Sequence, residues 1–305
     1  MTSFLVVGDG FAAAKVAAAV ASAPGTRLAA LACTRPPHQA AAAGRGGVEI
    51  VAADLLAQEA GLSRVRRLGA DWLLCINATV LLPAPLLALF GGGALNCHPG
   101  PLPEYAGLNA HQWAIRNGET AYGVTVHRME ARVDAGPIVA ARRFPIRHDD
   151  TGLSLFRRAL AEGADLLAAL VGRIAAGETL PSVPQDLSRR RLYRRRDAPE
   201  GGIDWRWPAD LVIRHVRAGN YEPFRSPTYV ARMDTPAGCP VEVLRAEPAG
   251  PTALAPGSLV ALPEQGPVVA CGDGLAVRIA RARDITGLLD AARWRRHFGL
   301  AASLP

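Results

Sequence analysis

Short apolar runs alternate with alanine- and leucine-rich stretches through the first half of the chain. Residues 4–7 are continuously apolar and lead into a glycine turn, whereas residues 11–22 carry the small and apolar side chains of a helix that packs on a sheet. This alternation is typical of a parallel sheet with crossover helices, which defines an α/β fold. The pattern continues and predicts strands over 27–33, 72–76, 94–97, 122–129 and 138–146, and helices over 55–61, 85–90, 109–116 and 151–176.

The pattern changes after Gly177, where the long helix is expected to end. Prolines and an arginine run lead up to Gly201, and a short helix is predicted over 209–218. Short apolar runs follow this helix, and the spacing of these runs favours a small β-barrel (OB-like). Separated by glycine and proline turns, these runs predict strands over 228–233, 241–247, 257–261, 268–270 and 275–281. We therefore predict an α/β domain over residues 1–185, an Arg-rich linker over 186–200 and a barrel-like domain over 201–305.

Composition excludes several classes of protein. The chain has 305 residues, half of them apolar and a fifth charged, which fits two globular domains. Its longest apolar stretch, residues 81–95, is interrupted by prolines and glycines and falls short of the ~20 unbroken residues that a membrane span needs. The N-terminal apolar run has no basic segment before it, so we expect a cytoplasmic protein. Five cysteines without a CxxC pair predict neither a disulfide framework nor a zinc site.

The charge is positive and unevenly distributed. The formal net charge is +7, with 33 arginines and one lysine, Lys15. Residues 186–305 carry 18 basic and 13 acidic side chains, a net +5, and six arginines fall within 189–196. Two interpretations stay open: a strip that binds the phosphates of a nucleotide or RNA, and a solvated linker. No RRM, KH or zinc-finger signature accompanies the run, so nucleic-acid binding would have no base-reading element.

The glycine turn after the first strand contains part of a dinucleotide-binding fingerprint, with Gly8 and Gly10 two positions apart. An NAD site needs a carboxylate at the end of the second strand, but the chain has Cys33-Thr34-Arg35 there, and Arg35 would favour a 2′-phosphate instead. Any doubly wound fold also needs a glycine turn between strand and helix. The turn alone therefore does not define a nicotinamide site.

The most informative polar residues are Asn96 and His98, at the carboxyl end of a predicted strand. Being two apart, their side chains point to one face, into the crevice where open α/β sheets bind ligands. An amide beside an imidazole suits acyl transfer, because the amide can hydrogen-bond an oxyanion while the imidazole donates to it or relays a proton. Cys97 alternates to the opposite face and is predicted to be a core residue. His127, on a later strand, is expected either to line the pocket mouth or to be a satisfied half-buried histidine.

Four more segments accompany this pair. They are Pro-Leu-Pro-x-Tyr-x-Gly at 101–107, Trp-Ala-Ile-x-Asn-Gly-Glu at 113–119, Gly-Val-Thr-Val-His at 123–127 and Asp-Ala-Gly-Pro-Ile at 134–138. In order and spacing, the set resembles the 10-formyltetrahydrofolate-dependent formyltransferases, which include tRNA, sugar and peptide-synthetase-associated enzymes. The resemblance is strongest over 94–160 and extends weakly over the whole chain. It implies a Rossmann-like formyltransferase domain with a mainly parallel sheet, followed by a small carboxyl-terminal β-barrel.

The resemblance implies a reaction and the residues that perform it. Asn96, His98 and Asp134 match the catalytic positions, with 10-formyltetrahydrofolate as formyl donor and no metal required. Asn96 and His98 would stabilise the oxyanion that forms when an amine attacks the formyl carbon, while Asp134 would orient the imidazole and help to accept the proton. Without the resemblance, Asp134 reads as a plain turn aspartate. Expected donor contacts are Leu82, Pro83, Asp134 and Gly136, and expected acceptor contacts are Tyr105, His111 and Gln112.

Two departures from the family pattern bear on the acceptor. His98 is followed by Pro-Gly where the family often has a serine two positions on, a form similar to the branch that formylates small amines or carrier-bound amino acids. Residues 36–47 offer only His38 and Arg45, whereas initiator-tRNA enzymes tend to have a long basic loop there. We therefore predict a small-molecule or carrier-protein-bound amine in specialised metabolism, ahead of initiator tRNA and a nucleotide amino sugar. Two further functions stay open, a formyltetrahydrofolate hydrolase and a catalytically silent basic binding module.

Overall fold

The computed structural model describes residues 1–34 and 48–300. The expectations for Arg35, His38 and Arg45 concern residues outside these ranges. The chain forms two compact units, each assembled from separate stretches of sequence. The first unit comprises Met1–Leu108, Ala121–Phe144 and Phe156–Leu192, and the second unit comprises Asn109–Thr120, Pro145–Leu155 and Tyr193–Pro305.

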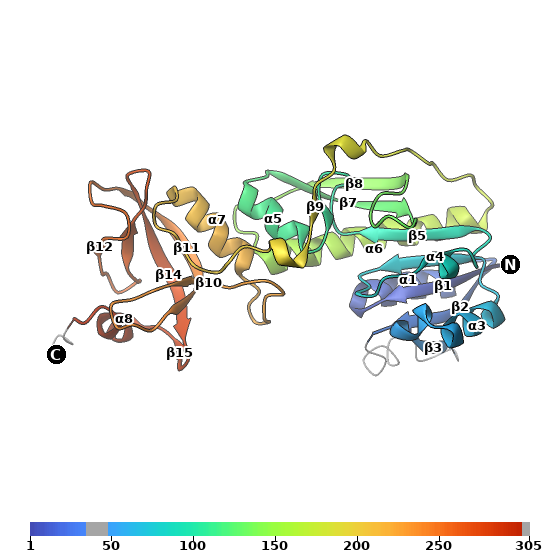
Figure 1. Ribbon diagram of the computed structural model, residues 1–305, viewed down its shortest axis with the longest axis horizontal. Coiled ribbons are helices and arrows are strands. Elements are labelled where there is room, and N and C mark those ends of the chain that lie inside the picture. Colours follow the sequence, from blue (N-terminus) through green and yellow to red (C-terminus); the bar gives the residue numbers. More distant parts are fainter. Residues whose placement is uncertain (35–47, 301–305) are drawn as a thin grey trace. The chain divides into compact units, whose positions relative to one another are not determined.

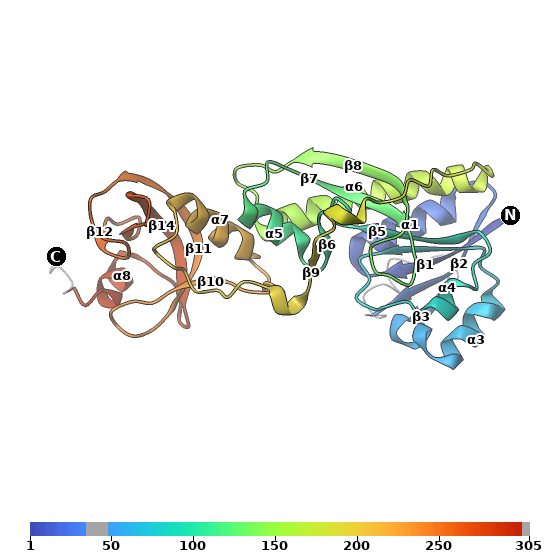
Figure 2. The same ribbon diagram turned by 45° about the horizontal axis from the view of Figure 1, so that its top comes forward.

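The first unit is built on a seven-stranded sheet. Its strands are β1 (Thr2–Gly8), β2 (Thr26–Cys33), β3 (Glu49–Ala52), β4 (Trp72–Ile76), β5 (Gly93–His98), β7 (Ala121–Arg128) and β8 (Ile138–Pro145). They lie in the order β3-β2-β1-β4-β5-β7-β8 (Figures 1 and 2). The pairs from β3 to β5 are parallel, and β5 pairs antiparallel with β7. The mainly parallel, Rossmann-like sheet that the sequence predicts is confirmed.

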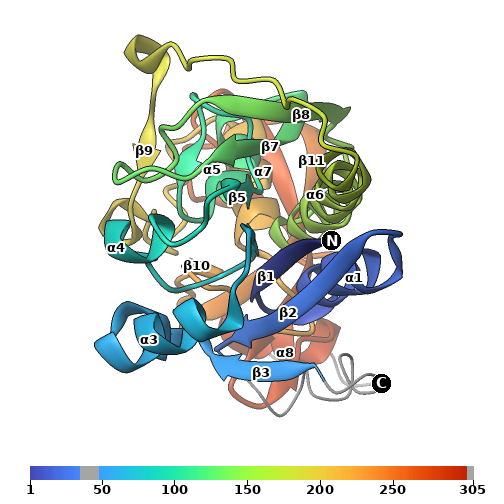
Figure 3. The same cartoon turned by 90° about the vertical axis from the view of Figure 1, so that its right-hand side faces the viewer.

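Helices cover both faces of this sheet. They are α1 (Gly10–Ser22), the 3₁₀ helix η1 (Ala53–Ala57), α3 (Glu59–Leu68), α4 (Ala84–Leu87) and α6 (Gly152–Ala175). Figure 3 shows α1 and α6 against one face and α3 and α4 against the other. This double cover explains why the strands read as unbroken apolar runs, since both of their faces are buried.

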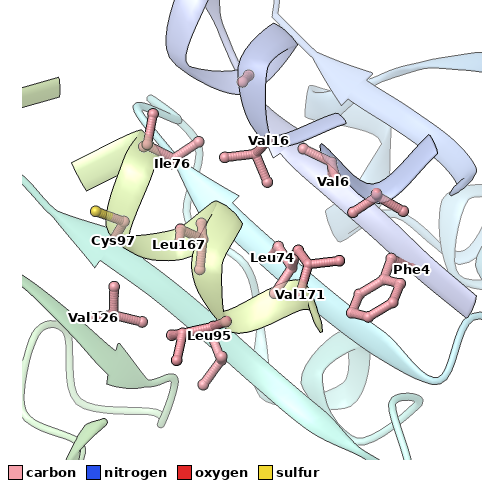
Figure 4. Packing of buried hydrophobic residues seen from close by; sticks show 14 of the residues in the cluster. Phe4, Val6, Val16, Leu74, Ile76, Leu95, Cys97, Val126, Leu167 and Val171 are labelled. Carbon is pink, nitrogen blue, oxygen red and sulfur yellow. The ribbon is translucent and has the colours of Figure 1, made fainter. Parts of the chain in front are cut away.

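Strand β1 shows how one run serves two cores. Phe4 and Val6 lie in the core beneath α1 and α6, whereas Leu5 and Val7 lie in the core on the opposite face. Figure 4 shows the first of these cores, where Val16 of α1 lies beside the sheet residues. Successive side chains of a strand point to opposite faces, so the apolar alternation fixes which edge residues face which layer.

The single helix predicted over 55–61 is wrong in its bounds, because these residues form the end of η1 and the start of α3, which continues to Leu68. The strand β3 before them is not predicted by the sequence. Gly61 lies inside α3 and does not end a helix. Glycine is needed there because a Cβ would come within 2.0 Å of the Leu55 carbonyl oxygen. Glycine here allows α3 to pack closely on η1.

The second unit carries an antiparallel sheet of six strands in the order β10-β11-β14-β13-β12, with β15 paired to β14. The strands are β10 (Ala231–Met233), β11 (Val241–Pro251), β12 (Leu259–Ala261), β13 (Val268–Ala270), β14 (Leu275–Asp284) and β15 (Gly287–Leu288). Register shifts between β11 and β14 mark irregularities of the kind at which long strands bend. The sheet is consistent with the predicted small barrel-like domain.

The second unit also contains the helices α5 (Ala110–Asn117), α7 (Ala209–Gly219) and α8 (Ala291–His297). Val212 and Val216 of α7 and Trp294 of α8 are buried in its core. The sequence does not predict α8, whose one buried side chain is Trp294. The remaining short elements of the described chain are β6 (Ala106–Gly107), η2 (Leu187–Arg189), β9 (Leu192–Tyr193) and η3 (Arg195–Asp197). Over residues 1–34 and 48–300, every helix is too short or too polar to span a bilayer.

Candidate active site

The site begins where β5 ends, beside its parallel neighbour β4. Asn96 and His98 lie on one face of β5, and Cys97 between them lies on the other, packed in the core with α6 (Figure 4). A Cβ on Gly163 of α6 would come within 2.6 Å of the Cys97 Sγ. Burial raises the pKa of the Cys97 thiol to about 12, with a smaller contribution from Cys75. Cys97 is therefore a core residue, as the alternation predicts.

Asp134 completes the cluster from the loop between β7 and β8. Its Oδ2 lies 3.6 Å from the Nδ1 of His98, and its Oδ1 lies 3.5 Å from the Nε2 of His127. The backbone N–H of Gly107 donates to Oδ2 at 2.8 Å. The residue has a left-handed backbone with φ of 51°. That conformation is uncommon outside glycine and costs of the order of 1 kcal/mol, so contacts around the loop must hold it.

The carboxyl group of Asp134 is ionised despite its burial. Burial alone raises its pKa, but the adjacent His98 and His127 imidazoles and the hydrogen bond from the Gly107 N–H act in the opposite direction. Together they hold the pKa of Asp134 well below its ordinary value. The site therefore keeps a fixed negative charge between two imidazole rings.

The hydrogen bonds of His98 define its tautomer. Its Nε2 lies 2.7 Å from the backbone carbonyl oxygen of Tyr105. A carbonyl oxygen only accepts, so Nε2 carries a hydrogen, and the Nδ1 of the neutral ring has a free lone pair beside Asp134. Gly100 makes room for this arrangement, since a Cβ there would lie 2.7 Å from the His98 Nε2 and 2.8 Å from the Tyr105 oxygen. His98 is thus arranged to accept a proton that a carboxylate then stabilises.

His127 links Asn96 to this cluster. The register of β5 and β7 places the two residues opposite each other, and the Asn96 Nδ2 lies 3.1 Å from the His127 Nε2. The His127 Nδ1 lies 2.8 Å from the Arg128 carbonyl oxygen, to which it donates. In the neutral ring Nε2 is then an acceptor, which takes one N–H of the Asn96 amide and leaves the other for a substrate oxygen. Sequence reasoning left the part of His127 open, because only the strand register reveals this contact.

The predicted donor residues lie at two places in the first unit. Leu82 and Pro83 follow β4, so their loop leaves the same sheet edge as β5. Gly136 belongs to the Asp134 loop, where a Cβ would come within 2.1 Å of the Arg128 carbonyl oxygen. Glycine is therefore needed for the close approach of this loop to the end of β7.

The predicted acceptor residues are all buried. Tyr105 is 6% exposed and its ring contacts that of Tyr122 edge-on, at 6.0 Å between centroids, so its backbone carbonyl is what reaches His98. His111 and Gln112 lie on α5 in the second unit. His111 hydrogen-bonds the Tyr221 hydroxyl. The first unit therefore assembles the Asn96, His98 and Asp134 cluster from its own chain, while these two side chains have partners in the second unit.

The buried Gln112 amide uses both of its ends within the second unit. Its Nε2 donates to the carbonyl oxygen of Ala218 at 2.9 Å and to the Ser226 hydroxyl at 3.1 Å. Its Oε1 accepts from the Thr228 hydroxyl at 2.8 Å. These contacts hold α5 to the start of the chain segment that follows α7.

Fold and site together define a class of protein: a Rossmann-like α/β fold that presents an amide, two imidazoles and a carboxylate at its strand ends. A family model described as formyl transferase matches residues 8–171, and one described as formyl transferase, C-terminal domain, matches residues 197–287. The chain belongs to the formyl transferase family.

Individual relatives give the range of this similarity. The chain is 36% identical over 203 residues to the methionyl-tRNA formyltransferase of Burkholderia multivorans, which covers 66% of this chain and 60% of that protein. The chain thus spans about 60% of that relative's length. Its fold is similar to the N-formyltransferase from Helicobacter canadensis in complex with folinic acid and dTDP-3-aminofucose (TM-score 0.70, 15% identity, 92% of this chain and 99% of that chain). It is also similar to HypX from Aquifex aeolicus in complex with tetrahydrofolic acid (TM-score 0.59, 22% identity, 96% and 46%).

Proposed function

We propose that this protein is an N-formyltransferase that moves a formyl group from 10-formyltetrahydrofolate to the amine of a small-molecule or carrier-bound acceptor in specialised metabolism. The observation that carries the proposal is the 3.6 Å approach of the His98 Nδ1 to the Asp134 carboxylate, with the Asn96 amide in the same cluster. Family membership supports the reaction class. The folate compounds bound to the Helicobacter canadensis and Aquifex aeolicus proteins support a reduced folate as donor.

The cluster accounts for each step of such a transfer. The lone pair of the acceptor amine forms a new bond to the formyl carbon, and the carbonyl electrons move to oxygen. The free N–H of Asn96 stabilises that oxygen, and the His98 Nδ1 takes the proton that the amine nitrogen sheds. Collapse then breaks the bond between the formyl carbon and N10, which leaves with a proton as tetrahydrofolate. The carboxylate of Asp134 stabilises the imidazolium between these two proton transfers.

Substrate positions follow from the arrangement of the loops. We propose that Leu82, Pro83, Asp134 and Gly136 contact the folate, because Leu82 and Pro83 follow β4, the strand paired with β5, and Gly136 lies in the Asp134 loop. We propose that Tyr105, His111 and Gln112 contact the acceptor. Because the polar atoms of Gln112 already have protein partners, its contact with an acceptor would be made by the edge of its side chain.

One observation on the second unit favours a small acceptor over tRNA. Arginines on β11 and β14 are paired with glutamates: Arg245 and Arg278 with Glu247, and Arg283 with Glu242 at 2.6 Å. A surface that binds a phosphate backbone needs arginines that are not already in ion pairs with carboxylates of the protein. Initiator tRNA is the second candidate, supported by the 36% identity to the Burkholderia multivorans enzyme, and a nucleotide amino sugar is the third, supported by the Helicobacter canadensis structure.

A panel of acceptors tests the proposal. Purified protein is incubated with 10-formyltetrahydrofolate and either free or carrier-bound amino acids, amino-sugar nucleotides or initiator tRNA, and formylated products are identified by mass spectrometry. We expect formylation of a small or carrier-bound amine that is lost in a His98→Asn variant. Formylation of tRNA alone, with salt-dependent retention on tRNA, would select the second candidate. Donor consumption without any acceptor would select the hydrolase, and no consumption under any condition would select a silent binding module.

The cysteines support a location for this chemistry. Among the described residues, Cys75, Cys97, Cys239 and Cys271 form no disulfide bond. Unpaired cysteines are typical of proteins that work in a reducing compartment. We infer a cytoplasmic enzyme.

A further inference from the structure

The segment of residues 183–192, which overlaps the Arg-rich linker that the sequence predicts over 186–200, contacts the loops that build the active site. Val183 and Ile138 exchange backbone hydrogen bonds of 2.8 and 2.9 Å at the start of β8. From this anchor the segment passes beside the Asp134 loop and then beside Tyr105–Gly107. Its side chains bond to backbone atoms of the first loop, and its backbone bonds to the second.

Gln185 contacts both sides of Asp134. Its Nε2 donates to the carbonyl oxygen of Gly136 at 2.7 Å and to that of Asp134 at 3.2 Å. Its Oε1 is buried and has no hydrogen-bond partner among the residues that the structure describes. The opposite amide orientation would bring Oε1 against two carbonyl oxygens, so the amide donates here even though its oxygen is left unsatisfied. This arrangement indicates that the contact to the Asp134 loop dominates the placement of Gln185.

Arg190 extends the same contact by one residue. Its Nη2 donates to the Val133 carbonyl oxygen at 2.8 Å. Gln185 and Arg190 therefore bind carbonyl groups before, at and after Asp134, the residue whose backbone has a φ of 51°. A strained backbone persists only where its surroundings hold it, and these side chains supply that hold.

The Gly107 N–H, which donates to the Asp134 carboxylate, belongs to a loop that also contacts the 183–192 segment. The Ala106 N–H donates to the Arg191 carbonyl oxygen at 3.0 Å, and Glu104 forms an ion pair with Arg189. Ala106 lies next to Gly107, whose N–H donates to the Asp134 Oδ2. The 183–192 segment thus fixes the position of the Gly107 N–H relative to the Asp134 carboxylate that accepts from it.

We propose that residues 183–192 position the catalytic carboxylate, and that Gln185 is the positioning residue that holds Asp134 against His98. The proposal rests on formyl transfer for its effect on rate, but its structural part is independent of the reaction. Loss of the Gln185 donor releases the Asp134 loop. The carboxylate then leaves both the imidazole and the Gly107 N–H, while the proposed folate contacts at Leu82 and Pro83 are kept.

Two substitutions separate the donor from the bulk of the side chain. Gln185→Glu keeps the length and replaces the donor by an oxygen, whereas Gln185→Ala removes the donor without adding charge and serves if the first variant does not fold. Gln58→Ala, at the exposed start of α3, and Arg196→Ala, 76% exposed and ion-paired with its neighbour Asp197, are matched controls.

Two measurements are made on each variant. In single turnover we expect Gln185→Glu and Gln185→Ala to lower the transfer rate by about tenfold or more, a larger loss than any loss of donor affinity, with both controls near wild type. Amide hydrogen exchange read by NMR should show the Gly107 N–H exchanging about tenfold faster in the Gln185 variants alone. Exchange at Gly107 equal to wild type, or full transfer rate in Gln185→Glu, would overturn the proposal. A wild-type protein that consumes no donor would instead refute formyl transfer, and the exchange result would still decide the positioning.

Discussion

His98 and Asp134 face each other with 3.6 Å between Nδ1 and Oδ2, while the opposite nitrogen of His98 is bound to the Tyr105 carbonyl oxygen at 2.7 Å. The carbonyl fixes the tautomer, so the free lone pair of the neutral ring lies on the side of the carboxylate. A proton accepted there is stabilised by a negative charge that burial does not neutralise. This pair gives the site both a base and the charge that base needs.

Replacing Asn96 should remove the oxyanion donor and little else. We expect Asn96→Ala and the isosteric Asn96→Asp to lower the single-turnover rate by about 10²–10³ while the donor still binds. Rapid-quench measurement of formylated product, with donor affinity from fluorescence titration, checks both parts. Turnover at the wild-type rate in either variant would remove Asn96 from the mechanism.

His127 should act through Asn96. Because its Nε2 accepts from the Asn96 amide at 3.1 Å, His127→Phe is expected to lower the rate by about tenfold by releasing that amide. The same substitution should lower the rate by a smaller factor in an Asn96→Ala background than in wild type, which a double-mutant cycle measures. Independent, multiplicative losses in the double variant would show that His127 acts elsewhere.

Part of this site can be predicted from the sequence and part cannot. The period of two along β5 places Asn96 and His98 on one face and Cys97 in the core, which the structure confirms. The contacts of Asp134 depend on a loop that returns to β5 from a distant stretch of chain, so without a family resemblance it reads as a turn residue. His127 depends on the register of β5 against β7, which no local pattern encodes.

Glycines explain the error in the fold. Gly61 reads as a helix stop, but it lies inside α3, where close contact with the Leu55 backbone excludes a side chain. The sequence does not distinguish a glycine that ends a helix from one that admits a neighbour. The same ambiguity applies to Gly100 and Gly136, where a side chain is excluded by close contact with His98 and with the Arg128 backbone, respectively.

The low pKa of Asp134 predicts a pH dependence of stability. The ordinary pKa of an aspartate side chain is about 3.9. Because the folded pKa lies below that value, the ionised carboxylate contributes stability that is complete above about pH 5 and is lost as the pH falls through about 4 toward the folded pKa. The difference in unfolding free energy between wild type and Asp134→Asn should therefore shrink from pH 5 to pH 3 in urea titrations. A difference that grows as the pH falls would contradict the direction of the shift.

Thiol reactivity should follow burial. Burial raises the pKa of Cys75 and of Cys97 to about 12, whereas Cys239 is exposed. Treating native protein with iodoacetamide at pH 8 should label Cys239 first and leave transfer activity intact, as peptide mass spectrometry and the activity assay can show. A Cys239→Ser variant is the control for labelling. Rapid inactivation with modification of Cys97 would contradict a core role for that thiol.

Two glycines of α6 provide a matched test of packing. A Cβ on Gly163 would lie 2.6 Å from the Cys97 Sγ, whereas one on Gly172 would meet nothing within 4 Å. We expect Gly172→Ala to stabilise the protein by up to about 1 kcal/mol through helix propensity. Gly163→Ala should destabilise it by about 1–3 kcal/mol through overpacking. Urea unfolding of both variants measures the contrast, and equal stabilisation by both would refute the close approach of α6 to β5.

The most direct test of the account is the single-turnover conversion of 10-formyltetrahydrofolate to tetrahydrofolate in the presence of an accepted amine, compared between wild type and His98→Asn. We predict that wild-type protein transfers the formyl group and that the variant, folded and still binding the donor, is slower by about 10³-fold or more. Equal rates for the two proteins would contradict the assignment of the proton transfer to His98 and, with it, the catalytic role of this cluster.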